Sequence, residues 1–305
     1  MQELLDSFVP CADEVWRLQR AETAAARLFQ AFCEEGHYAG REKPTDTRQG
    51  IYAVTPSGRL LTSWNTRNLD HVKSKMREAL ADWEDLDDAA RYPSEELVAG
   101  PRPEDHYPED GLVLQVFTRD LPREGDGQRE DWRREAWNVD HLWLRKEEAA
   151  ELAAKGLTAD AANRLVRLHG RDNVRGQSRR YPREAVTRAE LTTTNEKATG
   201  PSRRVQLRGY GAVSEAGEWS INDRHDGPAE HVRSFEGPML GRAVFDATTS
   251  RFTQFELAWV GLRRGATQYN GRADDPGPAP MAVVFVLAPP GDRVAPSWFW
   301  DYGWR

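Results

Sequence analysis

The spacing of hydrophobic and polar residues changes several times in the first quarter of the chain, and each change predicts an element. Residues 9–18 begin with two alternating sets, one of Val9, Cys11 and Asp13, and become apolar at Val15 and Trp16, which predicts a strand. Over residues 23–35, and again over residues 69–83, apolar residues recur every three or four positions, which predicts two amphipathic helices. Between them, the Thr-Pro-Ser-Gly turn at residues 55–58 divides two short apolar runs, so residues 50–62 are expected to form a β-hairpin.

The rest of the chain has mainly strand periodicity. Residues 85–110 are acidic and rich in proline, which is typical of a linker, and they divide a first domain of residues 1–84 from a second of residues 111–305. The second domain is predicted to contain two short helices, over residues 145–155 and 158–170. The pattern indicates an α+β protein whose second domain is a mainly antiparallel sheet with the two helices packed beside it. Its strands are expected at residues 112–117, 137–144, 186–194, 204–213, 240–247, 252–261 and 281–288.

Aromatic residues crowd the end of the chain. Trp298, Trp300, Tyr302 and Trp304 alternate with other residues, which predicts a strand with one aromatic face. We expect this face to be buried against the second domain rather than to stack on a ligand.

The elements predicted for residues 1–84 resemble those of a known family. They follow in the order helix, strand, helix, β-hairpin and final helix, with the hairpin running from Gly50 to Thr62. Residues 1–84 therefore resemble the thioredoxin-like superfamily, downstream of its Cys-x-x-Cys motif. The resemblance implies a truncated thioredoxin-like α/β domain without the redox pair, because the chain begins at Met1 beyond the place of that motif. The two-domain order also resembles a group of uncharacterised bacterial proteins, which implies no established activity.

Composition and charge narrow the classes of function. The 305 residues are 39% hydrophobic and 30% charged, and the net charge of −7 argues against binding to nucleic acid or to an anionic membrane. No run of about 18 apolar residues predicts a membrane span, and the N-terminus has no signal-peptide pattern, so a cytoplasmic location is expected. The GxGxxG, P-loop, G-x-S-x-G and HExxH motifs do not occur.

The two cysteines, Cys11 and Cys33, lie on different predicted elements. Dithiol–disulfide exchange needs a nucleophilic thiolate with a resolving thiol beside it, so this chemistry is not expected. Cys33 precedes His37 by four residues at a predicted helix end, where both side chains can share one face. Thiolate and imidazole suit copper or zinc, which makes this pair a candidate metal site. The alternative is that Cys33 belongs to the hydrophobic core.

The loop before the hairpin is a second candidate site. In thioredoxin-like folds this loop lines the active face, so the resemblance implies that His37, Tyr38, Arg48 and Gln49 lie near a substrate. In that interpretation Tyr38 and Arg48 have catalytic roles, and Gln49 binds the ligand. The alternative is an ordinary polar loop that turn hydrogen bonds hold in place.

Two histidines of the second domain are further candidates. His141 follows Asp140 in a predicted strand, where neighbours face opposite ways, and this favours a structural histidine. His169 continues the apolar stripe of a helix, where the structural alternative is an imidazolium stabilised by the helix dipole. As a functional group, His169 would be a metal ligand or a general base. Asn173 and Arg175, in the turn after it, would then bind a carboxylate or phosphate, unless the arginines there form a solvated face that pairs with the acidic linker.

A last group of metal-ligating side chains lies between residues 223 and 231. The spacing of Asp223, His225, Asp226 and His231 matches no specific zinc pattern. The Gly-Pro pair at residues 227–228 predicts a loop there.

Two hypotheses about function follow. In the first, His37, His141 and His169, with Cys33, hold one copper or zinc ion in a cleft between the domains. The protein would then be a metal-dependent enzyme, an oxidoreductase that acts on a small molecule. In the second, the chain is a non-catalytic thioredoxin-like module that binds a peptide, a protein or an anionic ligand.

Overall fold

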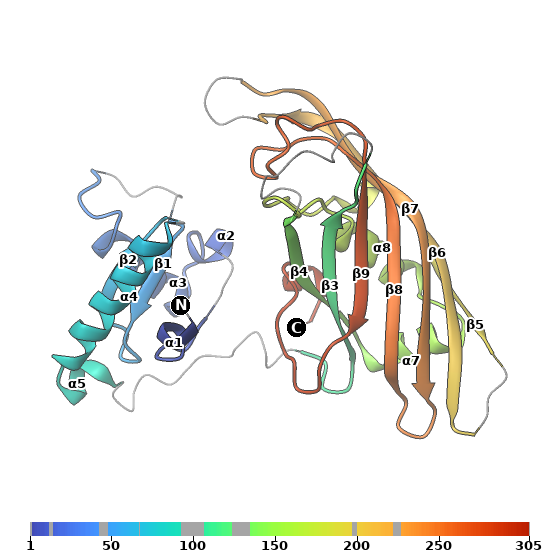
Figure 1. The fold of residues 1–305 in the computed structure, drawn as a ribbon, viewed down its shortest axis with the longest axis horizontal. Coiled ribbons are helices and arrows are strands. Elements are labelled where there is room, and N and C mark those ends of the chain that lie inside the picture. Colours follow the sequence, from blue (N-terminus) through green and yellow to red (C-terminus); the bar gives the residue numbers. More distant parts are fainter. Residues whose placement is uncertain are drawn as a thin grey trace. The chain divides into compact units, whose positions relative to one another are not determined.

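The protein is an α+β protein made of two compact units, residues 1–101 and residues 102–305 (Figure 1). No helix of the part of the chain that is described is long and apolar enough to cross a membrane. The computed structural model describes residues 2–11, 15–42, 48–66, 68–92, 107–123, 135–196, 200–221 and 227–304.

The first unit is built on a β-hairpin with helices on both of its faces. Thr23 starts α3 because its hydroxyl accepts a hydrogen bond from the backbone of Ala26, and Asn68 caps α4 in the same way. These two helices and the hairpin confirm the elements predicted from the sequence. The elements are α1 (Gln2–Leu5), α2 (Val15–Leu18), α3 (Ala24–Glu35), β1 (Ile51–Val54), β2 (Leu60–Trp64), α4 (Leu69–Glu84) and α5 (Asp88–Arg91).

The strand predicted over residues 9–18 is wrong wherever the structure describes these residues. Residues 15–18 form the single helical turn α2, and residues 9–11 form neither helix nor strand. The carbonyl of Leu18 at the end of α2 accepts a hydrogen bond from Gln30 of α3, at 2.9 Å. The side-chain amide of Gln30 therefore satisfies the carbonyl of Leu18, which in a strand would have bonded to a neighbouring strand.

Side chains along the hairpin point alternately to its two faces, and both faces pack against helices. Ala53 and Trp64 pack on Met76 and Ala79 of α4 and form the core of this unit. On the other face Tyr52 meets Phe29 of α3 edge to face, with ring centroids 5.7 Å apart.

The predicted linker of residues 85–110 is shorter than expected at both ends. In α5, the guanidinium of Arg91 donates to the carbonyls of Trp83 and Glu84, so this helix belongs to the first unit. Tyr107 is buried in the core of the second unit, against Trp143. Residues 93–106 lie outside the described residues.

The second unit is a seven-stranded antiparallel sheet in the order β4-β3-β9-β8-β7-β6-β5. Two helices, α7 (Lys146–Ala154) and α8 (Ala159–His169), cover one face of the sheet (Figure 1). Every strand and helix predicted for this unit before residue 290 is confirmed, and several strands are longer. The strands are β3 (Leu112–Asp120), β4 (Trp137–Leu144), β5 (Val186–Asn195), β6 (Ser202–Trp219), β7 (Ala229–Asp246), β8 (Arg251–Arg264) and β9 (Ala279–Leu287); a 3-10 turn, η3, spans Arg183–Ala185.

Strand β7 runs without a break through Gly237 and Pro238. A Cβ atom on Gly237 would lie 2.1 Å from the carbonyl oxygen of Val260. Gly237 is therefore needed for the close approach of two strands, not for a turn.

The core of the second unit lies between the sheet and the helices and is centred on Trp259. This side chain is fully buried and packs on Phe235, with ring centroids 4.5 Å apart. Gly170 at the end of α8 and Gly211 in β6 leave room for the indole. A Cβ atom on either glycine would lie 2.7 or 2.5 Å from a ring carbon of Trp259.

The C-terminal segment corrects the predicted aromatic strand. It forms a 3-10 turn, η4 (Phe299–Tyr302). Tyr302 and Trp304 are buried in the core, as expected, whereas Trp300 is 48% exposed. The segment is held to the edge strand β4 by bonds to side chains rather than by a strand ladder. The backbone N–H of Ser297 donates to Asp140, and the indole of Trp143 donates to the carbonyl of Val294. A covered edge strand is protected from pairing with other chains.

Candidate functional site

The loop that connects α3 to β1 brings together the residues singled out in the first domain. The ring of His37 hydrogen-bonds through Nε2 to the carbonyl of Gln49, at 3.0 Å. The hydroxyl of Tyr38 donates to the same oxygen, at 3.1 Å. Because a carbonyl only accepts, Nε2 of His37 carries the hydrogen. Its other nitrogen, Nδ1, is buried and has no hydrogen-bond partner among the described residues.

Cys33 and Arg48 are adjacent to this pair but have internal partners. The buried thiol of Cys33 lies 3.5 Å from the carbonyl of Arg48, and burial raises the pKa of the thiol. The guanidinium of Arg48 donates to Glu34, at 3.1 Å, and to the carbonyl of Gln19, at 3.0 Å. A neutral thiol and a paired guanidinium support the loop, so both residues fit the structural alternative better than the catalytic one.

An aromatic stack closes the inner side of the loop. His37 stacks on Tyr52, with ring centroids 5.1 Å apart, and touches Tyr38, at 4.4 Å. Burial raises the pKa of both tyrosines above the usual value. A Cβ atom on Gly50 would lie 2.3 Å from Cε1 of His37, so glycine is required there for the ring to pack on the chain.

An open groove of about 530 Å³ lies at the open end of the hairpin, beside this cluster. Gln49, Asn65 and Thr66 are exposed and bring polar groups, whereas Trp64 is only 5% exposed and Ile51 is 51% exposed. Sequence reasoning found Gln49 but missed the rest. Their position in the sequence could have indicated them, because they lie at the start of β1 and the end of β2, opposite the hairpin turn. The groove is lined by Gln49, Gly50, Ile51, Trp64, Asn65 and Thr66.

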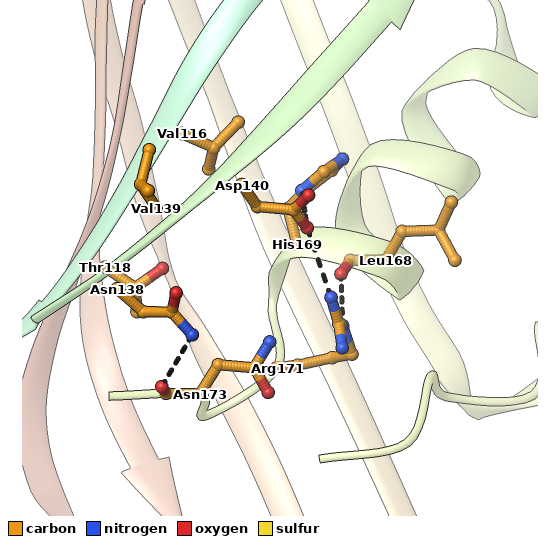
Figure 2. Close-up of a pocket in the computed structure, with 9 residues that line it drawn as sticks. All are labelled: Val116, Thr118, Asn138, Val139, Asp140, Leu168, His169, Arg171 and Asn173. Carbon is orange, nitrogen blue, oxygen red and sulfur yellow. Dashed lines mark hydrogen bonds and ion pairs between the residues drawn. The ribbon is translucent and has the colours of Figure 1, made fainter. Parts of the chain in front are cut away.

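In the second unit, His169 lies in a buried polar group under the sheet (Figure 2). Its Nε2 is 3.0 Å from the hydroxyl of Tyr302. Its Nδ1 is 3.5 Å from a carboxylate oxygen of Asp140, which also pairs with Arg171 at 3.2 Å. The cavity beside them is only about 10 Å³, which is room for one water molecule and not for a substrate.

The charge states of this group follow from its burial. Burial lowers the pKa of His169 from 6.5 to about 4, so the imidazole is neutral near pH 7. Burial opposes the charged form of Asp140, but His169, Arg171 and two backbone N–H groups outweigh it and lower the pKa of the carboxyl. The group is therefore a neutral histidine beside a buried, compensated carboxylate. The predicted imidazolium, stabilised by the helix dipole, is wrong because desolvation is the larger effect.

We expect the stability of the protein to depend on His169 in acid. The unfolded chain protonates this residue near pH 6.5 and the folded chain only near pH 4, so stability is full above that window and falls as the pH falls through it. Between pH 7 and pH 5 the loss from this group is about 2 kcal/mol. Urea unfolding at both pH values should show that His169→Gln removes this part of the loss, whereas His71→Gln, on the exposed side of α4, retains it. An unchanged pH dependence in His169→Gln would contradict the assignment.

His141 belongs to a different group from His169. Its Nε2 is 3.0 Å from Asp292, and the amide of Gln115 donates to the same carboxylate oxygen, also at 3.0 Å. Since Asp140 and His141 are neighbours in β4, their side chains face opposite sides of the sheet. The two histidines therefore have separate partners. Among the residues that the structure describes, no group of three or more His, Cys, Asp or Glu side chains is placed to hold a metal ion.

Asn173 and Arg175 have structural partners as well. The side chain of Asn173 accepts from the backbone of Ser178, at 2.9 Å, which shapes the turn after α8. Arg175 pairs with Asp120, at 3.0 Å, and with Asp275, at 3.2 Å, and its side chain is only 7% exposed. This arginine is therefore buried in ion pairs and is not part of a solvated face.

Arg175 belongs to a larger buried network at one end of the sheet. Its centre is Arg272, which is 0% exposed and pairs with both oxygens of Asp120, at 2.7 Å, and with those of Asp172, at 2.7 and 2.9 Å. Sequence reasoning missed this network because its partners are far apart in the chain. Its members are Arg123, Arg175, Arg263, Arg272, Asp120, Asp172 and Asp275.

Of the last predicted metal-ligating group, only His231 is described. It lies in β7 rather than in a loop, and its ring contacts Trp219 at a tilt, with ring centroids 5.6 Å apart. Asp223, His225 and Asp226 lie outside the described residues.

The fold and the site together define an α+β protein with a hairpin groove in one unit and a helix-covered antiparallel sheet in the other. Comparison of the chain with protein-family models, with curated proteins and with solved structures finds no match. The resemblance of residues 1–84 to the thioredoxin-like superfamily therefore stays a prediction.

Proposed function

We propose that the chain is a non-catalytic binding protein whose first unit binds an extended peptide in the hairpin groove. One observation carries the proposal. The side chains expected to do chemistry there, Cys33, His37, Tyr38 and Arg48, all bond to groups of the chain itself, and an open groove of about 530 Å³ lies beside them. A volume of this size is within the range of ligand sites, about 300–1,000 Å³.

The chemistry of the groove suits a peptide backbone. The amides of Gln49 and Asn65 each offer a donor and an acceptor, as a peptide unit does. The apolar surface of Ile51 offers a place for one side chain of the peptide. Among the described residues, β1 pairs only with β2, so its other edge has main-chain groups that can add a strand.

The metal-dependent enzyme, with copper or zinc bound by His37, His141, His169 and Cys33, stays a prediction. Each of these side chains has a partner in the structure, and a metal ion would have to displace at least the carboxylate or phenol now bound to the two histidines of the second unit. Metal analysis of the native protein tests it directly. A cytoplasmic location is part of our proposal, supported by the two free cysteines, of which Cys11 is exposed.

A charge placed in the groove is expected to weaken the binding of a peptide. Peptides selected from a random display library on the full chain should bind Ile51→Asp at least about tenfold more weakly, because the apolar contact is replaced by a desolvated carboxylate. Isothermal titration calorimetry measures the change. Ile51 is half exposed, so the variant should fold normally.

Two further variants sharpen the test. Gln49→Ala should weaken the same peptides about fivefold, the effect of one lost hydrogen bond. Gln177→Ala, an exposed amide of the second unit, should leave the affinity unchanged. Peptides that bind Ile51→Asp and the native chain equally would show that the groove is not their site.

A further inference from the structure

One face of the second unit's sheet has a continuous apolar row, and we call it the uncovered face because neither α7 nor α8 packs on it. Five residues are direct cross-strand neighbours on five consecutive strands, each paired with the next in the register. In sheet order they are Val139, Phe117, Val284, Ala258 and Leu240, and Arg208 ends the row.

Alternation along the strands places this row away from the helices. Trp259 and Val283, the neighbours of Ala258 and Val284 in sequence, are buried in the core against α7 and α8. The row therefore lies on the opposite face, the one on which neither helix packs (Figure 1).

Large apolar side chains on this face are exposed to an unusual degree. Leu240 is 59% exposed, Trp137 is 58% exposed, and Leu262 is 53% exposed. Val139 and Val260, on the same face, are 43% and 42% exposed. Single exposed apolar residues are normal, but a contiguous group of this kind marks an interaction surface.

The charges around the row indicate what covers it. Arg242 pairs with Glu256 at 2.9 Å, Arg188 with Glu190 at 2.8 Å, and Arg119 with Glu135 at 3.5 Å. Most of the charge on this face is thus balanced in place and gives little attraction for a phosphate backbone or an anionic lipid surface. An apolar centre with a rim of both signs is typical of a protein interface.

The dimensions and the arrangement of the row fit a second copy of the same face. Seven strands, each about 4.8 Å wide, and three rows, each about 7 Å deep, give roughly 700 Å², close to the ~800 Å² that each partner buries in a standard interface. This leaves out the row of Gln115 and His141, which Asp292 covers. A two-fold axis parallel to the strands and centred on β9 would place Val139 over the partner's Leu240, Phe117 over the partner's Ala258 and Val284 over the partner's Val284. Apolar residues then face apolar residues along the whole row, as a two-fold interface requires.

We propose that two copies of this chain form a two-fold dimer through the uncovered sheet faces of their second units, packed as two stacked sheets about 10 Å apart. The assignment is independent of the groove, because it uses no residue of the first unit.

Sedimentation velocity of the full chain over a range of concentrations tests the proposal. The native chain should sediment as a dimer with a dissociation constant of about 10 µM or tighter. Leu240→Asp should weaken the dimer more than about tenfold, because it places two carboxylates in an apolar interface. Circular dichroism checks the fold of this variant, and an exposed leucine can be replaced without disturbing the core.

A matched control is Leu69→Asp, an equally exposed leucine at the start of α4 in the first unit, which should leave the dimer unchanged. A native chain that stays monomeric at about 100 µM overturns the proposal. So does a dimer that Leu240→Asp leaves intact, because another surface would then hold it.

Discussion

Replacing Arg272 by methionine is expected to lower the free energy of unfolding by about 3–5 kcal/mol. The guanidinium is fully buried and holds the carboxylates of Asp120 and Asp172 through four hydrogen bonds of 2.7–2.9 Å. Methionine fills a similar volume but leaves two buried carboxylates with fewer partners. The folded state is destabilised because the desolvation of these carboxylates is no longer offset by the guanidinium. Urea unfolding, monitored by circular dichroism, measures the change.

The control for this prediction is Arg183→Met. Arg183 pairs with Asp160 at the surface, and its side chain is 69% exposed, so its loss should cost less than about 1 kcal/mol. If both variants are equally stable, the buried network does not contribute to stability as proposed. Asp172→Asn is also expected to be strongly destabilising, since it removes one of the two carboxylates that hydrogen-bond to Arg272.

Replacing Trp259 by alanine is expected to lower the free energy of unfolding by about 3–5 kcal/mol. The indole is 0% exposed and fills the space between β8 and the end of α8. Removal of the ring leaves a cavity beside Gly170 and Gly211. Neither glycine has a side chain that could fill this cavity. The backbone around them is fixed by α8 and β6 and cannot collapse far.

Trp300→Ala is the matched control, since Trp300 is 48% exposed. Its loss should cost about 1 kcal/mol or less. Trp259→Phe should recover part of the lost stability by refilling some of the cavity. A Trp259→Ala protein as stable as the Trp300→Ala variant would mean that the core is not centred on this residue.

Local patterns explain why most elements of the second unit were predictable from the sequence. Helix α8 begins at a capping threonine, Thr158, and its apolar residues recur at helical spacing. The strands alternate because one face of the sheet is buried and the other is not. The same alternation made the uncovered apolar face visible only once the register was known.

Other features depend on partners that are distant in the chain. Asp172 and Arg272 are 100 residues apart, and Asp120 and Arg272 are 152 residues apart, so no local pattern could have paired them. The aromatic residues of the C-terminus alternate like a strand, yet the segment forms η4 because its tyrosine bonds to His169 and its backbone to Asp140. The short helix α2 forms for a similar reason, since Gln30 binds its last carbonyl.

The candidate site was predictable in part. Residues singled out in the loop before the hairpin lie together, with His37 and Tyr38 on one carbonyl of Gln49. The chemical roles of these residues could not be predicted from the sequence, because burial and internal hydrogen bonds determine them. The sequence alone could not show that Cys33 is a buried, protonated thiol or that Arg48 is tied to Glu34.

The most direct test of the binding function is a backbone amide NMR titration of the full, isotopically labelled chain with a peptide selected on it. We expect the largest shift changes at Gln49, Gly50 and Ile51 and at residues 64–66, on the two sides of the groove. Changes confined to the second unit, or a peptide that binds without affecting these residues, would contradict this expectation.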